Sequence, residues 1–336
     1  MISILSPINT IDEIYELKKA GAGEVYCGYV PDYWKDLFNK VLDDKEGSYQ
    51  VGINKRDVSR ANIADYSSLC KLLDLAEQME IEVFVTLNAA FYPFQAYQVM
   101  DRYLEELSEV GVRNVIVSDI GMMQKIKTDH PELKLTVSCL SQVMNMYSVE
   151  FYRQFSPRRI VFPRHVTVDE IVKIVSRFPE IEFEFFLFSD KCIYDDGNCR
   201  CHHDIGTICM DVWNTDVYVS PYVSQSYRID ETDEEAFRRW TRNYGYVGGM
   251  EDRTFGNIGC SLCALPRLVL YKNINSIKIV GRGKATRIKV QLVELAAAAL
   301  KLAENNASQN EMKAFIRERL PLNDGMCESN RYCIIR

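Results

Sequence analysis

The stretch IEVFVTLNAAFYPFQAYQVMDRYLEELSEVGVRNVIVSD, residues 81–119, decides the fold of this chain. It begins with a short apolar run at residues 81–88. Residues 96–111 then carry apolar side chains at helical spacing, and a second apolar run follows at residues 114–119. Nearly continuous apolar strands are typical of a parallel sheet that is buried on both faces. A helix between two such strands indicates a βαβ unit.

The same alternation continues in both directions along the chain. Further strands are expected at residues 2–8, 24–30, 133–139, 158–164, 181–188 and 276–282. Each of the resulting eight strands leads into a helical pattern or a long excursion. Eight βα units predict an α/β fold, specifically a closed (β/α)8 TIM-type barrel rather than an open sheet.

The predicted barrel is a single domain over residues 1–304, followed by a C-terminal appendage at residues 305–336. The connection between the seventh and eighth strands, about residues 189–275, is far longer than an ordinary barrel loop. Long loops in compact domains are usually functional, and we therefore expect this excursion to carry the site.

Composition narrows the class of protein. The formal net charge of −7 over 336 residues argues weakly against a general nucleic-acid binder, which needs a basic face. No secretory leader and no apolar run long enough to span a membrane is visible, so we expect a cytoplasmic protein without a membrane span. Disulfides are disfavoured in that compartment, and clustered cysteines there more often bind metal or do redox chemistry.

The excursion is rich in such cysteines. It holds six of the eleven cysteines, namely Cys192, Cys199, Cys201, Cys209, Cys260 and Cys263, and also His202 and His203. The spacing alone leaves three alternatives open: an iron–sulfur cluster, a zinc site and a redox-active pair of thiols. Cys27, Cys70 and Cys139 lie in apolar segments and are interpreted as core residues.

Polar residues follow several of the expected strands, where a barrel enzyme places its active site. They are Ser6, Asn88, Asp119, Ser138, Arg164, Ser189 and Arg282. Arg164 and Arg282, with Arg60 and Lys278 as further candidates, could bind a carboxylated substrate. Glu184 points into the barrel by strand alternation and therefore needs a basic partner such as Lys278 or Arg164.

Several of these segments resemble the U32 peptidase-like family. The matching segments are GAGEVYCG, SRANIADYSSL with Arg60 and Asn62, VFVTLNAAFY with Asn88, VIVSDIGMM with Asp119, LTVSCLSQVMNMYSVEFY with Ser138, Gln142 and Asn145, RRIVFPRHVTVDEI with Arg164, EFFLFSDKCIYDDGNC with Glu184, Cys192 and Cys199, and LCALPRL through SIKIVGRGKA with Cys263, Lys278 and Arg282. The family includes the UbiU and UbiV proteins of oxygen-independent ubiquinone synthesis, RNA hydroxylation proteins, and collagenase-like proteases in older naming.

The resemblance implies a 4Fe–4S cluster, with zinc as the alternative metal. By position in the family pattern, the ligands would be Cys192, Cys199, Cys209 and Cys263, with Cys201 and Cys260 as substitutes for the third. The implied catalytic residues are Asn88, Asp119, Arg164 and Glu184. The implied substrate-binding residues are Arg60, Asn62, Ser138, Gln142, Lys278 and Arg282. One departure is His165, which stands where the family usually has Glu.

The implied function is oxygen-independent hydroxylation of a small molecule or RNA, with prephenate as the candidate oxygen donor and a related U32-family chain as a candidate partner. Two alternatives remain. One is a peptidase, although the chain shows no HEXXH or G-x-S-x-G motif. The other is a non-catalytic subunit that carries a cluster or zinc and supports a partner.

Overall fold

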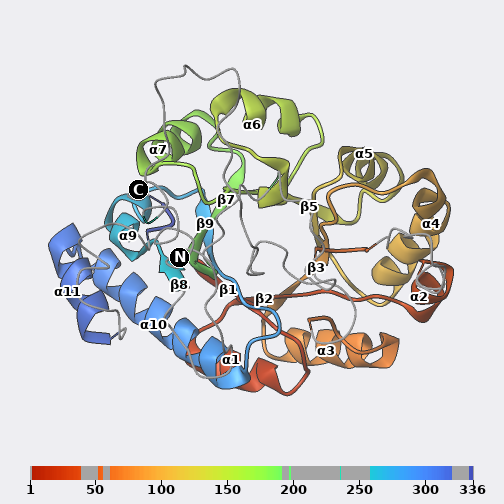
Figure 1. Cartoon of the computed structure of the whole chain (residues 1–336), viewed down its shortest axis with the longest axis horizontal. Helices are drawn as coiled ribbons and strands as arrows, with labels where there is room; N and C mark the ends of the chain where they lie inside the picture. The colour runs from red at the N-terminus through yellow and green to blue at the C-terminus, as the bar shows by residue number, and fades with distance from the viewer. Residues whose placement is uncertain are drawn as a thin grey trace. The chain divides into compact units, whose positions relative to one another are not determined.

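The computed structural model describes residues 2–38, 52–55, 61–190, 197, 235, 258–319 and 333–335 (Figure 1). The chain divides into two compact units, Met1–Arg200 with Phe255–Arg336 and, separately, Cys201–Thr254. Nearly all described residues belong to the first unit, and the account below concerns that unit. No helix in the described part of the chain combines the length and apolarity that crossing a membrane requires.

The first unit is built on a closed barrel of parallel strands. The strands are β1 (Ser3–Pro7), β2 (Glu24–Cys27), β3 (Glu82–Leu87), β4 (Asn114–Val117), β5 (Lys134–Val137), β6 (Arg159–Val161), β7 (Glu182–Asp190) and β9 (Ile274–Ile279). Each pairs in parallel with its neighbour, and β9 closes the ring between β7 and β1. This topology confirms the (β/α)8 prediction.

Three strands end three residues earlier than predicted. β2 stops at Cys27, β6 at Val161 and β9 at Ile279, whereas the predicted strands continue to residues 30, 164 and 282. At β6 the reason is Pro163, which has no backbone N–H to donate to a neighbouring strand. The residues beyond these ends therefore lie above the barrel, in the loops that follow its strands.

One further strand was not expected. β8 (Ile258–Cys260) runs antiparallel to the end of β7, with Gly259 opposite Ser189. Residues near the C-terminus pair with it through the backbone. Cys333 forms an isolated parallel β-bridge with Cys260, and the amide of Ile334 donates to the Cys260 carbonyl at 3.0 Å. Both ends of the long excursion are thus held beside β7.

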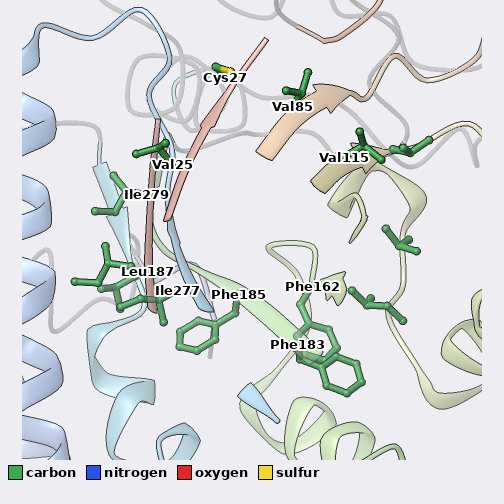
Figure 2. Close-up of a cluster of buried hydrophobic side chains, with 14 of the residues drawn as sticks. Val25, Cys27, Val85, Val115, Phe162, Phe183, Phe185, Leu187, Ile277 and Ile279 are labelled. Atoms are coloured by element: carbon green, nitrogen blue, oxygen red, sulfur yellow. The ribbon is translucent and has the colours of Figure 1, made fainter. Parts of the chain in front are cut away.

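Helices surround the barrel (Figure 1). They are α1 (Glu13–Ala20), α2 (Asp32–Phe38), α3 (Tyr66–Gln78), α4 (Phe94–Glu109), α5 (Ile120–Asp129), α6 (Met146–Arg153), α7 (Val168–Arg177), α9 (Leu265–Leu268), α10 (Thr286–Glu304) and α11 (Gln309–Arg319), with short 3₁₀ turns η2 (Cys139–Ser141) and η4 (Leu262–Ala264). Side-chain caps begin several of them: Asp65, Asp119, Asn145 and Thr167 each accept a backbone N–H. Apolar strand residues such as Val85 and Phe183 belong to the main core cluster (Figure 2).

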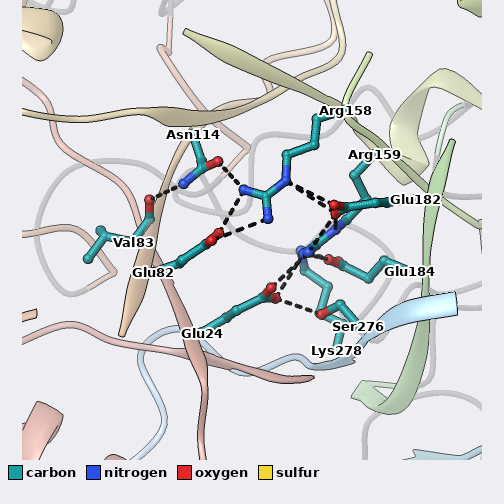
Figure 3. Close-up of polar contacts among 10 residues, drawn as sticks. All are labelled: Glu24, Glu82, Val83, Asn114, Arg158, Arg159, Glu182, Glu184, Ser276 and Lys278. Carbon is teal, nitrogen blue, oxygen red and sulfur yellow. Dashed lines mark hydrogen bonds and ion pairs between the residues drawn. The ribbon is translucent and has the colours of Figure 1, made fainter. Parts of the chain in front are cut away.

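Charged residues fill the N-terminal end of the barrel instead of apolar ones (Figure 3). Arg159, only 1% exposed, donates to Glu24 at 2.7 and 2.8 Å, to Glu182 at 3.1 Å and to Glu184 at 3.1 Å. Next to it, Arg158 donates to the Glu82 carboxylate at 2.7 Å. A small apolar layer of Leu5, Tyr26, Phe84 and Ile116 forms a separate buried cluster.

Removing Arg159 should therefore destabilise the barrel strongly. Arg159→Met would leave the buried Glu24 and Glu184 carboxylates short of a partner, and breaking a buried pair typically costs about 3–5 kcal/mol. Urea unfolding followed by circular dichroism measures this loss. Arg153→Met is the control, because Arg153 is half exposed and its ion pairs should contribute only about 0–1 kcal/mol. Equal effects of the two substitutions would contradict a structural role for the buried network.

Candidate active site at the C-terminal ends of the strands

A buried polar cluster lies where β2, β3 and β9 end. Arg282 follows β9, and its Nη1 donates to Thr86 Oγ1 at 2.9 Å, to Asn54 Oδ1 at 3.2 Å and to Asn62 Oδ1 at 3.5 Å. Arg282 is only 7% exposed. We call Arg282, Asn54, Asn62 and Thr86 the Arg282 cluster. The three side-chain oxygens of this cluster that accept from Arg282 are uncharged, and together they fix the direction of its guanidinium group.

Glycine makes this close approach sterically feasible. A Cβ on Gly28 would lie 1.8 Å from Asn62 Oδ1 and 2.7 Å from Arg282 Nη1, well inside contact distance. Gly281, immediately before Arg282, has a φ of 144°, a backbone conformation that side chains rarely tolerate. Thr86 is held in turn by a hydrogen bond to the Cys27 carbonyl at 3.0 Å. The backbone on both sides therefore shapes the cluster.

The Cys27 thiol beneath this cluster stays protonated at neutral pH. Burial raises the pKa of Cys27 to about 12, and the nearby positive charge of Arg282 offsets only part of that rise. This supports the interpretation of Cys27 as a core residue, because a reactive cysteine needs an accessible thiolate.

A second basic group follows β6, a strand that only β7 separates from β9 in the ring. Arg164 follows β6, and its Nε donates to the Ser189 hydroxyl at 2.8 Å, while its guanidinium carbon lies 4.8 Å from the centre of the Phe186 ring. Burial raises the pKa of Cys139, and the charges of Arg164 and Lys278 act in the opposite direction. Arg164 and Lys278 thus both act electrostatically on the end of β5.

Glu184 and Lys278 are partners inside the barrel. The fully buried Glu184 accepts from Lys278 Nζ at 2.9 Å and from Arg159 Nη1 at 3.1 Å, so both of its oxygens are engaged. Lys278 Nζ also lies 4.4 Å from the centre of the Tyr26 ring. The predicted need for a basic partner is met by Lys278. This pair links the charged N-terminal end of the barrel to the residues above it.

Asn88 and Asp119 organise loops. Asp119 begins α5 by accepting from the Met122 amide at 2.7 Å, and it also accepts from the Tyr92 amide at 3.1 Å and from the Tyr97 hydroxyl. Asn88 accepts from the Lys55 amide at 3.1 Å. The structure therefore gives both residues local positioning contacts, and their predicted catalytic role stays a prediction.

Ser138 and Gln142 mark the contact between β5 and the cysteine-rich excursion. Ser138 begins η2 by accepting from the Leu140 amide at 3.3 Å, and Gln142 ends it with a φ of 54°. A Cβ on Gly197 would lie 2.2 Å from Cγ of Gln142 and 2.6 Å from the Leu140 carbonyl oxygen. Residue 197, two positions before Cys199, therefore lies directly against the loop that follows β5.

Most of the cysteines predicted to bind the cluster lie outside the residues that the structure describes. Cys192, Cys199, Cys201, Cys209 and also Arg60 fall outside the described residues. Cys263 is partly buried in η4 and Cys260 is buried in β8. Among the residues that the structure describes, no three His, Cys, Asp or Glu side chains converge to hold a metal ion. The cluster ligands stay a prediction.

Sequence reasoning missed two members of the Arg282 cluster. Thr86 lies in the same VFVTLNAAFY segment as Asn88, but threonine is common in strands and Thr86 gave no signal of its own. Asn54 lies in a loop with no recognisable pattern, and only the fold brings it to Arg282. Asn62 and Arg282, which were both predicted, lie within hydrogen-bonding distance of each other at 3.5 Å, and their role in substrate binding stays a prediction.

Comparison with known proteins shows the family. The model of Peptidase family U32 matches residues 9–322, and the chain belongs to this family. The tRNA hydroxylation protein P of Escherichia coli is 25% identical over 197 residues, covering 58% of this chain and 38% of that protein. The uncharacterized protease MJ0090 of Methanocaldococcus jannaschii is 24% identical over 203 residues, covering 59% and 43%. This chain spans less than half the length of either relative.

A solved structure of the same family shows a distant likeness. The U32 peptidase Mk0906 aligns with 57% of this chain and 70% of its own, at 11% identity and a TM-score of 0.42. The barrel assignment itself rests on the strand pairing described above.

The Arg282 cluster makes a steric prediction. Gly28→Ala should lower the free energy of unfolding by about 1–3 kcal/mol, because the new methyl group overpacks the cluster. Combining it with Asn62→Ala removes the nearest clash, so the double variant should lose less than the sum of the two single losses. A complete set of urea unfolding curves measures the coupling. Strict additivity would show that Gly28 is not held against Asn62.

Proposed function

We propose that this chain is a 4Fe–4S protein that catalyses oxygen-independent hydroxylation of RNA, or supports it together with a related U32-family chain. The observation that carries the proposal is the position of the cysteine-rich excursion. It leaves the barrel at the end of β7, beside Arg164, and returns through β8, which pairs with β7. Family membership and the tRNA hydroxylation named for one relative support the choice of reaction and substrate.

The donor chemistry suits an iron–sulfur cluster. The proposed ligands are Cys192, Cys199, Cys209 and Cys263, and cysteine thiolates are the usual ligands of such clusters. β8 ends three residues before Cys263 and pairs with the end of β7. β7 in turn ends two residues before Cys192 in the sequence. When bound, the cluster would supply a redox or Lewis-acid centre whose properties depend on burial and hydrogen bonding.

The chain's own residues would bind the oxygen donor. A dicarboxylate such as prephenate needs two cationic groups, and Arg164 and Arg282 are suited to binding carboxylates through paired N–H groups. Ser189 and the Phe186 ring orient Arg164, while Thr86 and the two asparagines orient Arg282. Pre-oriented side chains lose less conformational entropy on binding, which favours affinity.

The first test concerns the metal. Protein purified without oxygen should be brown and contain about four irons and four sulfides per chain. Cys192→Ala should lose this iron, whereas Cys70→Ala should retain it because Cys70 lies on α3 and is not part of the cysteine-rich sequence segment. Stoichiometric zinc without iron or sulfide would contradict the cluster. Iron retained in both variants would contradict the choice of ligands.

The second test concerns the donor. Prephenate at one hundred times its Kd should stabilise the folded protein by about 2.7 kcal/mol and raise its Tm accordingly. Arg164→Gln should abolish most of this shift. The control is Arg177→Gln, an exposed residue in the last turn of α7. An unchanged Tm of the wild-type protein in millimolar prephenate, or equal shifts in both variants, would contradict the proposed donor site.

A peptidase is the second candidate, favoured by the name of the methanogen relative. A Ser or Cys protease needs a nucleophile next to a histidine. In the described part of the chain, His130 contacts the carboxylates of Asp101, on α4, at 3.5 Å and of Glu132, in the turn after α5, at 3.6 Å. The cluster and donor tests separate this candidate from a hydroxylase.

A further inference from the structure

A buried ion pair joins α1 to α10 and plays no part in the site described above. Lys289, on α10, is 1% exposed, and its Nζ donates to both carboxylate oxygens of Glu13 at 2.8 Å. Glu13 begins α1 and also accepts from the Thr286 hydroxyl at 2.8 Å. A buried ion pair is often no more stabilising than apolar side chains of similar volume. Stability alone therefore does not account for this pair.

Asn9 connects the pair to the loop that carries Arg282. Asn9 lies two residues after β1, and its Oδ1 accepts from Lys289 Nζ at 2.5 Å and from the Gly283 backbone N–H at 3.1 Å. The backbone N–H of Asn9 donates to Glu13 Oε2 at 2.8 Å. Gly283 directly follows Arg282 in the sequence. A chain of hydrogen bonds therefore runs from the buried ion pair to the backbone beside Arg282.

This loop needs support from outside itself. Gly281 and Gly283 have φ values of 144° and 86°, in a region that glycine enters readily but does not hold firmly. One backbone hydrogen bond crosses the turn, from the Lys284 amide to the Gly281 carbonyl at 3.0 Å. The contact with Asn9 adds a second constraint, from a different strand. It acts on the residue that directly follows Arg282.

The sheet register places Asn9 beside the site. β1 and β9 are paired with Leu5 opposite Lys278, and the same register continued for four residues puts Asn9 level with Arg282. The guanidinium group of Arg282 is directed by the Arg282 cluster. Its backbone is held through Gly283 by Asn9. Arg282 is thus fixed at both ends, by two separate sets of contacts.

The ammonium group of Lys289 decides which way the Asn9 amide faces. Burial lowers the pKa of Lys289, and the hydrogen bond and charge of Glu13 act against that fall and favour the ammonium form. An ammonium group can only donate, so the Asn9 atom that faces it is the acceptor Oδ1. The same oxygen then accepts from Gly283. A reversed amide would set N–H donors against each other at both contacts.

We propose that Asn9 is a positioning residue for Arg282 and that the buried Lys289–Glu13 pair fixes the orientation of the Asn9 amide. This inference rests on the proposed role of Arg282 in binding the oxygen donor. With Asn9 in place, the loop presents the guanidinium group already oriented toward a carboxylate. Without it, ligand binding must also order the loop, and that entropic cost lowers the affinity.

Calorimetric titration of the full chain, purified without oxygen, with prephenate is the first measurement. Asn9→Ala should weaken binding about fivefold, the effect of one further group that binding must immobilise. Asn9→Asp keeps an acceptor oxygen toward Lys289 and Gly283, and it should restore most of the affinity. The matched control is Thr167→Ala, which removes the cap of α7 and lowers stability without contacting the Arg282 loop. The control should bind prephenate as the wild-type chain does.

The second measurement needs no ligand. Hydrogen exchange, followed by mass spectrometry of peptides that span residues 280–285, should be about fivefold faster in Asn9→Ala, the factor that one hydrogen bond contributes. The double variant Lys289→Met/Glu13→Leu should show a similar increase, and it avoids leaving Glu13 buried without its partner. Thr167→Ala should leave exchange in these peptides unchanged.

Three outcomes would overturn the inference. The first is unchanged exchange around Arg282 in Asn9→Ala. The second is faster exchange with undiminished prephenate affinity, which would give Asn9 a purely structural role. The third is an equal loss of affinity in Asn9→Ala and Thr167→Ala, which would reflect general destabilisation. A wild-type chain that does not bind prephenate would instead contradict the proposed donor site, and the exchange measurement would still decide whether Asn9 holds the loop.

Discussion

Arg159 contacts three carboxylates, two on the neighbouring strand β7 and one on β2, and the rest of the barrel depends on this buried contact. A charge with 1% exposure is tolerated only when it is fully paired, and Glu24, Glu182 and Glu184 provide that pairing. Because Glu184 also binds Lys278, the network extends from the closed N-terminal end of the barrel toward its mouth. Rigid support from below is what a precisely placed site requires.

Above this support, two arginines are held in different ways. Arg282 is enclosed by the side chains of Asn54, Asn62 and Thr86, and the absence of a side chain on Gly28 makes room for them. Arg164 is partly exposed and is oriented by one hydroxyl and one aromatic face. The first arrangement suits a fixed anchor for a carboxylate. The second leaves the guanidinium group of Arg164 freer to change its direction.

The sequence predicted the barrel well because its signal is repeated: each apolar run is followed by a helical pattern, and errors at single strand ends do not change the topology. It also predicted the pairing of Glu184 with a basic residue, since an inward carboxylate on a buried strand needs one. It missed β8, whose three residues are too few to show a pattern and whose pairing depends on a distant strand. It missed Asn54 and Thr86 for a related reason, because their role arises only from side chains brought together by the fold.

The central claim is that this chain takes part in hydroxylating RNA without oxygen. The most direct test compares hydroxylated nucleosides in tRNA, by mass spectrometry, from anaerobically grown cells that contain or lack the gene for this chain. The account predicts that at least one hydroxylated nucleoside disappears with the gene and returns with the wild-type chain but not with Cys263→Ser. An unchanged set of hydroxylated nucleosides in cells without the gene would contradict it.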